Sequence, residues 1–191
     1  MTRLLFKFIV VSIIACFLSS CSNQKDKQDQ KADSIDIETA HTLRQQKLRS
    51  FNDSLYSIFE KSPQELISIY GKPKKSEIRE FENVHNGEID TVYDLDFDTV
   101  SVLLYYASSQ KRYLVGKVET SSNSLLNIIG FYLDSPDTMV VNSIGLANQA
   151  EIDSSGIDIF TYKSGDIAEC YTQFHFKDSK LIKVVYLPYF D

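Results

Sequence analysis

SPQELISIYG, residues 62–71 of this 191-residue chain, carries the strongest local signal of structure, because it marks both ends of a short helix. Its serine can cap the first turn, its proline suits the first helical position, and Glu65 can reach back to the cap. Gly71 can adopt the left-handed conformation that ends a helix. The sequence therefore predicts a helix over 63–70.

An amphipathic helix is expected just before it. Between Glu38 and Glu60 the apolar residues recur at steps of three, four and seven, which places them on one helical face. These residues are Leu43, Leu48, Phe51, Leu55, Ile58 and Phe59. Charged and amide side chains fill the other positions, so we expect the apolar stripe to pack against a core.

After the short helix the hydrophobic pattern changes to a period of two, as in half-buried strands. We predict strands over 78–82, 91–98, 100–107 and 112–120. Asn86-Gly87 provides a turn after the first of them, and a polar turn joins the last two.

The same order of elements then recurs. Ser135-Pro136 again resembles a cap followed by a first helical residue, and MVVNSIG at 139–145 aligns with ELISIYG at 65–71. Three further strands are predicted, over 157–163, 168–177 and 180–189. Helix, glycine stop and antiparallel strands thus occur twice, which indicates an internal duplication.

The sequence therefore predicts an α+β fold in which amphipathic helices pack on antiparallel sheet, built from two fused helix-plus-β-meander repeats. The first module, including the N-terminal helix, spans 37–122, and the second spans 123–191. A single continuous domain with one larger sheet is the alternative.

A family resemblance rests on these residues. The short helix ending in IYGKP (69–73), followed by twisted antiparallel strands, resembles the SmpA/OmlA (BamE) group of small lipoproteins. The tandem arrangement is similar to the β-lactamase inhibitor protein fold, in which each half lays helices across a meandering sheet. The second copy departs from the pattern, with Gly145-Leu146-Ala147 in place of Gly-Lys-Pro. The resemblance implies a fold and carries over no functional residue.

The first 20 residues have the layout of a secretory signal peptide. Arg3 and Lys7 precede an apolar run at 8–18, which is too short for a transmembrane helix. Small residues follow the run, and then Cys21.

Leu18-Ser19-Ser20-Cys21 resembles a lipobox. The resemblance implies diacylglycerol on the Cys21 sulfur, cleavage before Cys21, and acylation of the new amino terminus. Two or three acyl chains, at about 0.8 kcal/mol per buried CH₂, would make a stable membrane anchor. An ordinary secretory signal cut elsewhere is the alternative.

A disordered tether is expected over 21–36, where aromatic residues are absent. Lys25-Asp26 resembles the charged signals that send lipoproteins of Bacteroidota to the cell surface. We therefore expect a lipid-anchored protein of the cell envelope, at the outer membrane. The formal net charge is −6 and no basic stripe is present, which argues against nucleic acid as a partner.

Asp94, Asp96 and Asp98 form the densest acidic cluster. They alternate with apolar residues, so we expect the solvated face of a strand. A cation site is the alternative, although the glycine and the closing glutamate of a calcium loop are missing from it.

Cysteine chemistry centres on Cys21, since Cys16 lies in the signal segment. Cys170 and His175 are five residues apart on a predicted strand and should point to opposite faces, which argues against a nucleophile–base pair. Cys170 is expected to be a buried, inert thiol that shares its face with Phe174.

His41, His85 and His175 have no metal-ligand spacing, so surface or packing roles are expected. No phosphate loop, dinucleotide fingerprint or nucleophile elbow occurs. The sequence thus predicts no catalytic, cofactor-binding or metal-binding residue, and Cys21 is the one assigned site.

The later strands are rich in aromatic residues, namely Tyr105, Tyr106, Tyr113, Tyr186, Tyr189 and Phe190. Because strand residues alternate, Tyr105 and Tyr106 cannot both face one core. An exposed tyrosine-rich sheet face is a plausible binding surface, and ordinary sheet packing is the alternative.

A non-enzymatic lipoprotein that binds an envelope protein, or acts as a scaffold, is therefore the leading hypothesis. A periplasmic or surface protein that binds a small ligand or a cation is the second. An enzyme is the third, and it would need a pocket that the linear sequence does not reveal.

Overall fold

The capped helix forms as predicted in the computed structural model, which describes residues 42–164 and 170–188. Helix α3 spans Pro63–Tyr70. The Ser62 hydroxyl accepts from the Glu65 N–H (3.3 Å), and the Glu65 carboxylate accepts from the Ser62 N–H (2.8 Å). Gly71 ends the helix at φ 83°, where a side chain would be strained.

Within residues 42–164 and 170–188, eight strands form one continuous antiparallel sheet in the order β1-β2-β3-β4-β8-β7-β6-β5. The first four are β1 (Lys75–Glu82), β2 (Ile89–Asp96), β3 (Val100–Ala107) and β4 (Arg112–Thr120). The others are β5 (Gln149–Ile152), β6 (Asp158–Ser164), β7 (Cys170–Lys177) and β8 (Lys180–Leu187). The α+β class and the antiparallel sheet are thus confirmed. The strands form one larger sheet, as the alternative prediction had it.

Two meanders meet at the middle of this sheet. Among the described residues, strands β4 and β8 share three register pairs, Val118 with Tyr186, Glu119 with Val185 and Thr120 with Val184. By comparison, β3 and β4 share eight. This central seam is therefore the narrowest pairing between long strands and depends on the elements packed over it.

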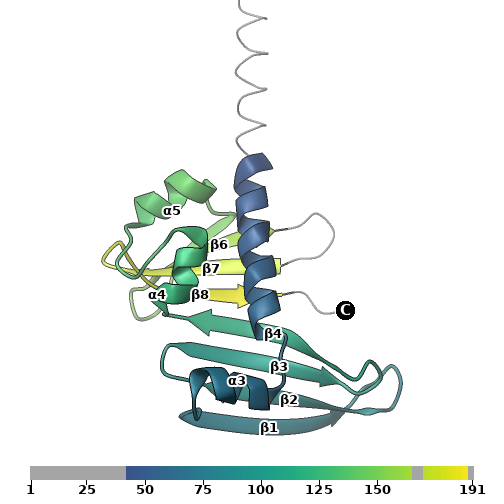
Figure 1. Ribbon diagram of the computed structural model, residues 1–191. Coiled ribbons are helices and arrows are strands. Elements are labelled where there is room, and N and C mark those ends of the chain that lie inside the picture. The colour runs from purple at the N-terminus through teal and green to yellow at the C-terminus, as the bar shows by residue number, and fades with distance from the viewer. Residues whose placement is uncertain (1–41, 165–169, 189–191) are drawn as a thin grey trace, which may run out of the picture. The chain divides into compact units, whose positions relative to one another are not determined.

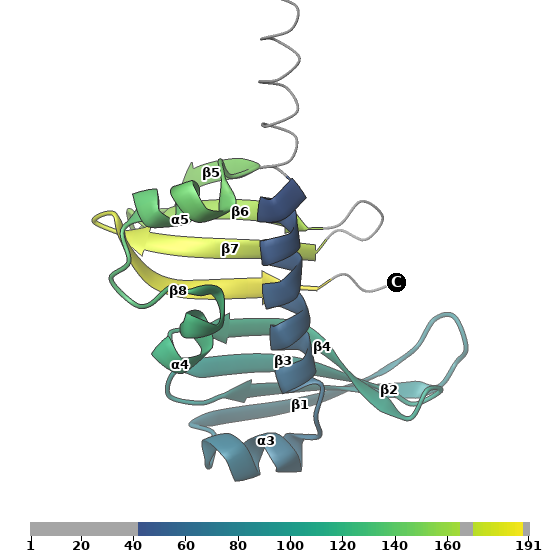
Figure 2. The same cartoon turned by 45° about the horizontal axis from the view of Figure 1, so that its top comes forward.

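The described helices all lie on one face of the sheet (Figures 1 and 2). A helix over 42–59 crosses the strands, and α4 (Asn123–Leu126), η1 (Asn127–Ile129) and α5 (Asp137–Ile144) lie beside it. Its predicted stripe is confirmed at Leu48, Phe51, Leu55 and Phe59, each at most 1% exposed. These residues belong to one core cluster with the inward side chains of both meanders.

Within the described residues, no helix is long and apolar enough to cross a membrane.

The second helix starts differently from its prediction. Ser135 is not its cap: helix α5 begins at Asp137, its N-cap is Pro136, and no side chain caps it. Ser135 is fully buried, and its hydroxyl accepts from the Tyr132 N–H at 3.0 Å. The hydroxyl therefore closes the turn before the helix. Gly145 does end α5, at φ 105°.

The strand predictions are confirmed for β3 and β4 and shifted by one to three residues elsewhere. Strand β5 and the α4–η1 segment were not predicted. Residues 1–41, 165–169 and 189–191 lie outside the described part of the chain. The signal segment 1–20, Cys21, the tether 21–36, His41, Tyr189 and Phe190 are among them.

A buried amide fixes the long helix to the second meander. Asn52 is 3% exposed, and its Nδ2 donates to the Ser164 hydroxyl at 2.6 Å. Its Oδ1 accepts from the Thr172 hydroxyl at 2.7 Å. Since Ser164 and Thr172 lie on β6 and β7, these bonds set the position of the helix along the sheet.

Asn52→Ala should lower the free energy of unfolding by about 1–3 kcal/mol, because it removes a buried partner from both hydroxyls. Urea denaturation of the purified protein measures this. Ser57→Ala, at an exposed position on the same helix, is the matched control and should change stability by less than about 0.5 kcal/mol. A loss no larger than that of the control would contradict the assigned role.

Candidate functional site

The sheet has a face that no described helix covers, and we call it the open face. Strand alternation and register place Val92, Tyr105 and Leu114 side by side on it, on β2, β3 and β4. Their neighbours Leu104 and Val115 point to the helices and are fully buried. The prediction that Tyr105 and Tyr106 face opposite sides is therefore correct.

A pocket of about 350 Å³ opens at the hairpin end of this face. We call it the tip pocket; it is lined by Phe81, Glu82, Asn83, Val84, His85, Tyr105, Ala107, Ser109, Gln110 and Leu114. The Phe81 and Tyr105 rings lie 5.5 Å apart between centroids. Val84 is 90% exposed and Phe81 is 41% exposed. Apolar surface is thus presented to solvent around a concave site.

The Asp90 carboxylate holds the two hairpin turns of the tip pocket together. Its Oδ2 accepts from Asn83 Nδ2 at 2.8 Å and from the Tyr105 hydroxyl. Its Oδ1 accepts from the backbone N–H of Ser108 at 2.8 Å, in the β3–β4 turn. Asn83 Oδ1 in turn accepts from the His85 N–H at 3.0 Å. Tyr105 is therefore fixed in place as the pocket wall.

The pKa shifts of Asp90 and Tyr105 agree with these hydrogen bonds. The hydrogen bond from Tyr105, then those from the Ser108 N–H and Asn83, lower the pKa of the Asp90 carboxyl. Burial and the neighbouring Asp90 raise the pKa of the Tyr105 hydroxyl. At neutral pH an ionised carboxylate thus accepts from a protonated phenol, which is the charge-assisted form of the bond.

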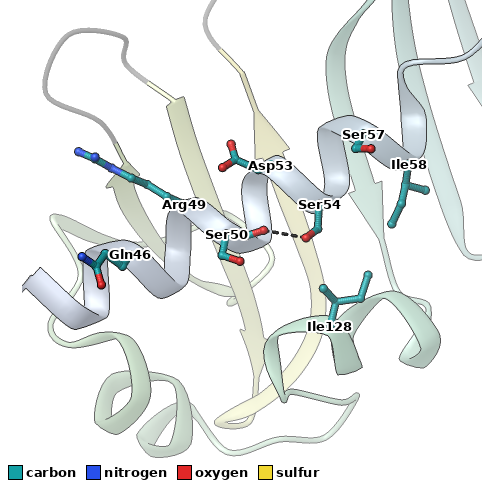
Figure 3. A pocket seen from close by; sticks show the side chains of 8 residues that line it. All are labelled: Gln46, Arg49, Ser50, Asp53, Ser54, Ser57, Ile58 and Ile128. Carbon is teal, nitrogen blue, oxygen red and sulfur yellow. Dashed lines mark hydrogen bonds between the residues drawn. The ribbon is translucent and has the colours of Figure 1, made fainter.

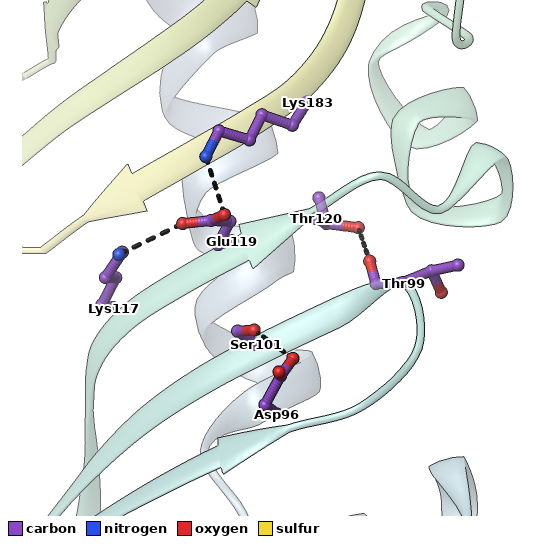
Figure 4. Close-up of polar contacts among 7 residues, drawn as sticks. All are labelled: Asp96, Thr99, Ser101, Lys117, Glu119, Thr120 and Lys183. Carbon is purple, nitrogen blue, oxygen red and sulfur yellow. Dashed lines mark hydrogen bonds and ion pairs between the residues drawn. The ribbon is translucent and has the colours of Figure 1, made fainter. Parts of the chain in front are cut away.

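The central seam carries ion pairs on the open face (Figure 4). Glu119 on β4 contacts Lys183 on β8 at 2.8 Å and Lys117 at 3.2 Å. Burial raises the pKa of the Glu119 carboxyl, but the two lysines outweigh it and the pKa is lowered overall. The Lys183 contact therefore joins the two meanders across the seam.

The acidic cluster behaves as a strand face, as predicted. Leu95 and Phe97 are buried, whereas Asp94 and Asp96 lie on the open face and Asp98 is exposed beyond the strand. Asp96 accepts from the Ser101 hydroxyl at 2.7 Å, and Asp98 forms an ion pair with Lys74. Within residues 42–164 and 170–188, no three potential metal ligands come together. Asp96 and Asp98 therefore have partners within the protein.

Cys170 and His175 lie on opposite faces of β7, as predicted. Cys170 shares the helix side with Phe174 and packs against the core, partly buried. His175 lies on the open face beside Lys183 and is only 8% exposed. Its Nε2 is buried without a hydrogen-bond partner among the described residues. Burial, then the Lys183 charge, lowers the pKa of His175 to about 4.

The other aromatic candidates that the structure describes, Tyr106, Tyr113 and Tyr186, are not on the open face. Tyr106 and Tyr113 pack against each other on the helix side, with centroids 4.9 Å apart. Tyr186 is 4% exposed in the core. Among the predicted aromatic residues that the structure describes, Tyr105 alone belongs to the tip pocket.

A second concavity follows the solvent side of the long helix (Figure 3). It is lined by Gln46, Arg49, Ser50, Asp53, Ser54, Ser57, Ile58 and Ile128. Ser54 donates to the Ser50 carbonyl at 2.7 Å, so this hydroxyl is used within the helix. Few of these side chains are apolar, and we place the candidate site at the tip pocket.

Sequence reasoning missed most of the residues that build the tip pocket. Asn83 and Ser108 have the sequence context of turn residues, and Phe81 that of a strand residue. A signal was present in the turn Asn83–Gly87, where asparagine can accept from its own backbone two residues on. The contacts of Asp90 with Asn83 and Ser108 depend on how the strands pair, which the sequence alone does not reveal.

No protein-family model matches the chain, and no curated protein is similar to it in sequence. Among solved structures, a cysteine-rich secretory protein from Staphylococcus aureus aligns with 65% of this chain at 12% identity and a TM-score of 0.39. An extracellular protein with an SCP domain from Bacillus anthracis aligns with 66% at 13% identity and a TM-score of 0.35. The alignments span 41% and 42% of those two chains. Similarity at this level assigns neither a fold family nor a function.

Lowering the pH from 6.5 to 4 should destabilise the protein through His175. Its pKa is about 4 in the folded state and 6.5 as a free side chain, so only the unfolded chain gains a proton in this range. The neutral imidazole of the folded state therefore contributes fully to the free energy of unfolding above pH 6.5. This contribution is lost by pH 4, which lowers the free energy of unfolding by about 3 kcal/mol.

Urea denaturation at pH 7 and pH 4.5 measures this loss. His175→Gln should lose much less stability over the same range, whereas His85→Gln, at an exposed turn position, should behave as the unmodified chain. Equal losses in all three proteins would contradict a buried, neutral His175.

Proposed function

We propose that this chain is a membrane-anchored lipoprotein of the cell envelope whose folded part binds another protein through the tip pocket. The observation that carries the proposal is an apolar concave site at the exposed end of an otherwise uncovered sheet face. Val84 and Phe81 are exposed there, beside a ring that the Asp90 network holds in place. Preformed pockets that accept a large side chain are where binding energy concentrates in protein interfaces.

The chemistry of the pocket defines its occupant. Phe81, Tyr105, Ala107 and Leu114 supply apolar and aromatic surface, and the surrounding turns supply polar groups. An aromatic or long aliphatic side chain of the partner would fill the centre, and its backbone would meet the polar rim. Asp90 does not line the pocket; its carboxylate accepts from three donors and holds the Tyr105 wall in place.

Location rests on the amino terminus. The signal segment 1–20 and the lipobox at 18–21 support lipid attachment at Cys21. A polar tether over 21–36 would separate the folded part from the bilayer. We propose the outer membrane, on its periplasmic or surface side, as the site of anchoring.

The proposed origin is a tandem duplication, as in the SmpA/OmlA-like or β-lactamase-inhibitor-protein-like arrangement. Gly71 and Gly145 support it, because both follow an eight-residue helix with positive φ and a ψ of −170°. Both also donate their N–H to the carbonyl four residues earlier, at 2.9 and 2.8 Å. Four strands follow each glycine.

A small apolar ligand is the second candidate for the same pocket. The volume of the tip pocket, about 350 Å³, lies at the lower end of the range for small-molecule sites, roughly 300–1,000 Å³. Val84 lines the pocket but is 90% exposed, so a protein partner would bury much more of its side chain than a small ligand at the concave centre would. Substitution at Val84 therefore separates the two candidates.

Val84→Glu should abolish capture of the envelope partner, because a charge would enter the apolar interface. The assay is affinity purification of the tagged full chain from detergent-solubilised envelope after mild crosslinking. Leu146→Glu is the matched control: Leu146 is 87% exposed and lies outside the pocket, so capture should persist. If Val84→Glu still captures the envelope protein and Phe81→Ala does not, the contact lies at the pocket centre alone. That result would favour the second candidate, a small apolar ligand.

Cys21→Ala should prevent lipid attachment, so that metabolic labelling with a palmitate analogue is lost and the protein leaves the membrane fraction. Cys170→Ser is the control and should be labelled normally. Continued labelling of Cys21→Ala would contradict the proposed anchor.

A further inference from the structure

Strand β1 is an edge of the sheet that no described element covers. It is the outermost strand beyond β2, and all eight of its residues are exposed. Ile78, at its centre, is 60% exposed. An edge of this length presents a row of backbone groups that can pair with another strand. The opposite edge, β5, has only four residues.

The backbone groups that point outward can be assigned from the ladder. The Asn83 N–H donates to the Glu88 carbonyl at 2.8 Å, on the line of the β1–β2 register. Because bonding alternates along an antiparallel strand, the odd-numbered residues of β1 bond to β2. Ser76, Ile78 and Glu80 therefore direct their N–H and C=O groups to the open edge.

We propose that β1 pairs with β1 of a second copy, antiparallel and about a two-fold axis at Ile78, so that the two sheets become continuous. A two-fold axis that relates antiparallel strands stands normal to the sheet, which puts the helices of both copies on the same side. Ile78 then bonds to Ile78 of the second copy through both backbone groups. Ser76 pairs with Glu80 on either side.

The charges on the other face of β1 fit this register. Glu77 faces Arg79 of the second copy, and Arg79 faces Glu77, so that two opposite-charge pairs form. Lys75 faces the Phe81 ring of the second copy, where a cation is favourable. Opposite charges directly across a strand pair stabilise it, and like charges destabilise it.

Neighbouring registers that keep the same backbone bonding are unfavourable. Moving the axis to Arg79 places the two Arg79 side chains opposite each other. Moving it to Glu77 places the two Glu77 carboxylates together and sets Lys75 against Arg79. The register centred on Ile78 is therefore the one in which β1 is complementary to itself.

Glu77 is available for this contact. Within its own chain it lies 3.6 Å from Arg79 and 3.9 Å from Lys75, and all three side chains are roughly half or more exposed. Such exposed pairs contribute little to stability, so the side chains are free to reach across the edge. A single strand pair buries little apolar area, so we expect a weak dimer, with a dissociation constant in the micromolar to millimolar range, roughly.

Ile78→Cys tests the pairing in the full chain, in a Cys170→Ser background. Hydrogen-bonded antiparallel pairs have Cα atoms about 5.5 Å apart, within the range of a disulfide. Mild oxidation of the membrane-bound protein should therefore give a disulfide-linked dimer. Ile152→Cys, on the β5 edge, and the Cys170→Ser parent are the controls and should give none above background. Equal dimer from Ile78→Cys and Ile152→Cys would overturn the proposal.

Charge reversal tests the register. In the Ile78→Cys background, Glu77→Arg alone sets arginine against arginine, and Arg79→Glu alone sets glutamate against glutamate. Each should reduce crosslinking about tenfold, since two attractive pairs become repulsive. Co-expression of the two differently tagged variants should restore a mixed dimer, because both arginines of the first variant then face glutamates of the second.

Formation of the mixed dimer distinguishes pairing between two copies from an effect within one chain. Each variant still carries its own substitution in the mixed dimer, so a defect within the chain would remain. Circular dichroism of each variant controls for folding. Homodimers that persist in both single variants, or a failure of the folded variants to form the mixed dimer, would overturn the register.

Discussion

One helix laid across a sheet is the constraint on which the structure depends. The apolar stripe of the 42–59 helix supplies buried residues to a core shared by both meanders. The strands alone would join the meanders weakly, through three register pairs between β4 and β8. Asn52 adds direction to this packing, because its two bonds to β6 and β7 are satisfied in a single position of the helix. The Glu119–Lys183 pair closes the seam from the other side.

The uncovered face follows from that arrangement. With every described helix on one side (Figure 2), the other side of the sheet must be compatible with solvent or with a partner. Along the seam it is polar and paired. At the hairpin end it is aromatic and concave, and the Asp90 network holds Tyr105 at the wall of the pocket. The open face thus carries an apolar concave site at its hairpin end and ion pairs along its seam, and binding surfaces commonly combine an apolar centre with polar surroundings.

The sequence correctly predicted the features that depend only on residues close together in the chain. The capping box of α3, the bounds of β3 and β4, and the opposite faces of Cys170 and His175 all depend on neighbouring residues. Contacts between distant segments could not be predicted in this way. Ser135 has the sequence of a cap but is recruited into a buried turn, and β5 gains its strand structure only by pairing with β6. The tip pocket likewise requires the β1–β2 and β3–β4 turns to meet.

We propose that this protein meets its partner at the hairpin end of the open face. Site-specific photo-crosslinking in intact cells tests it most directly, with a photoreactive amino acid at position 84 and, in a separate strain, at position 146. Both positions are almost fully exposed, so they differ in location and not in access. We expect one discrete adduct from position 84 and none from position 146. An adduct from position 146 alone would contradict the proposal.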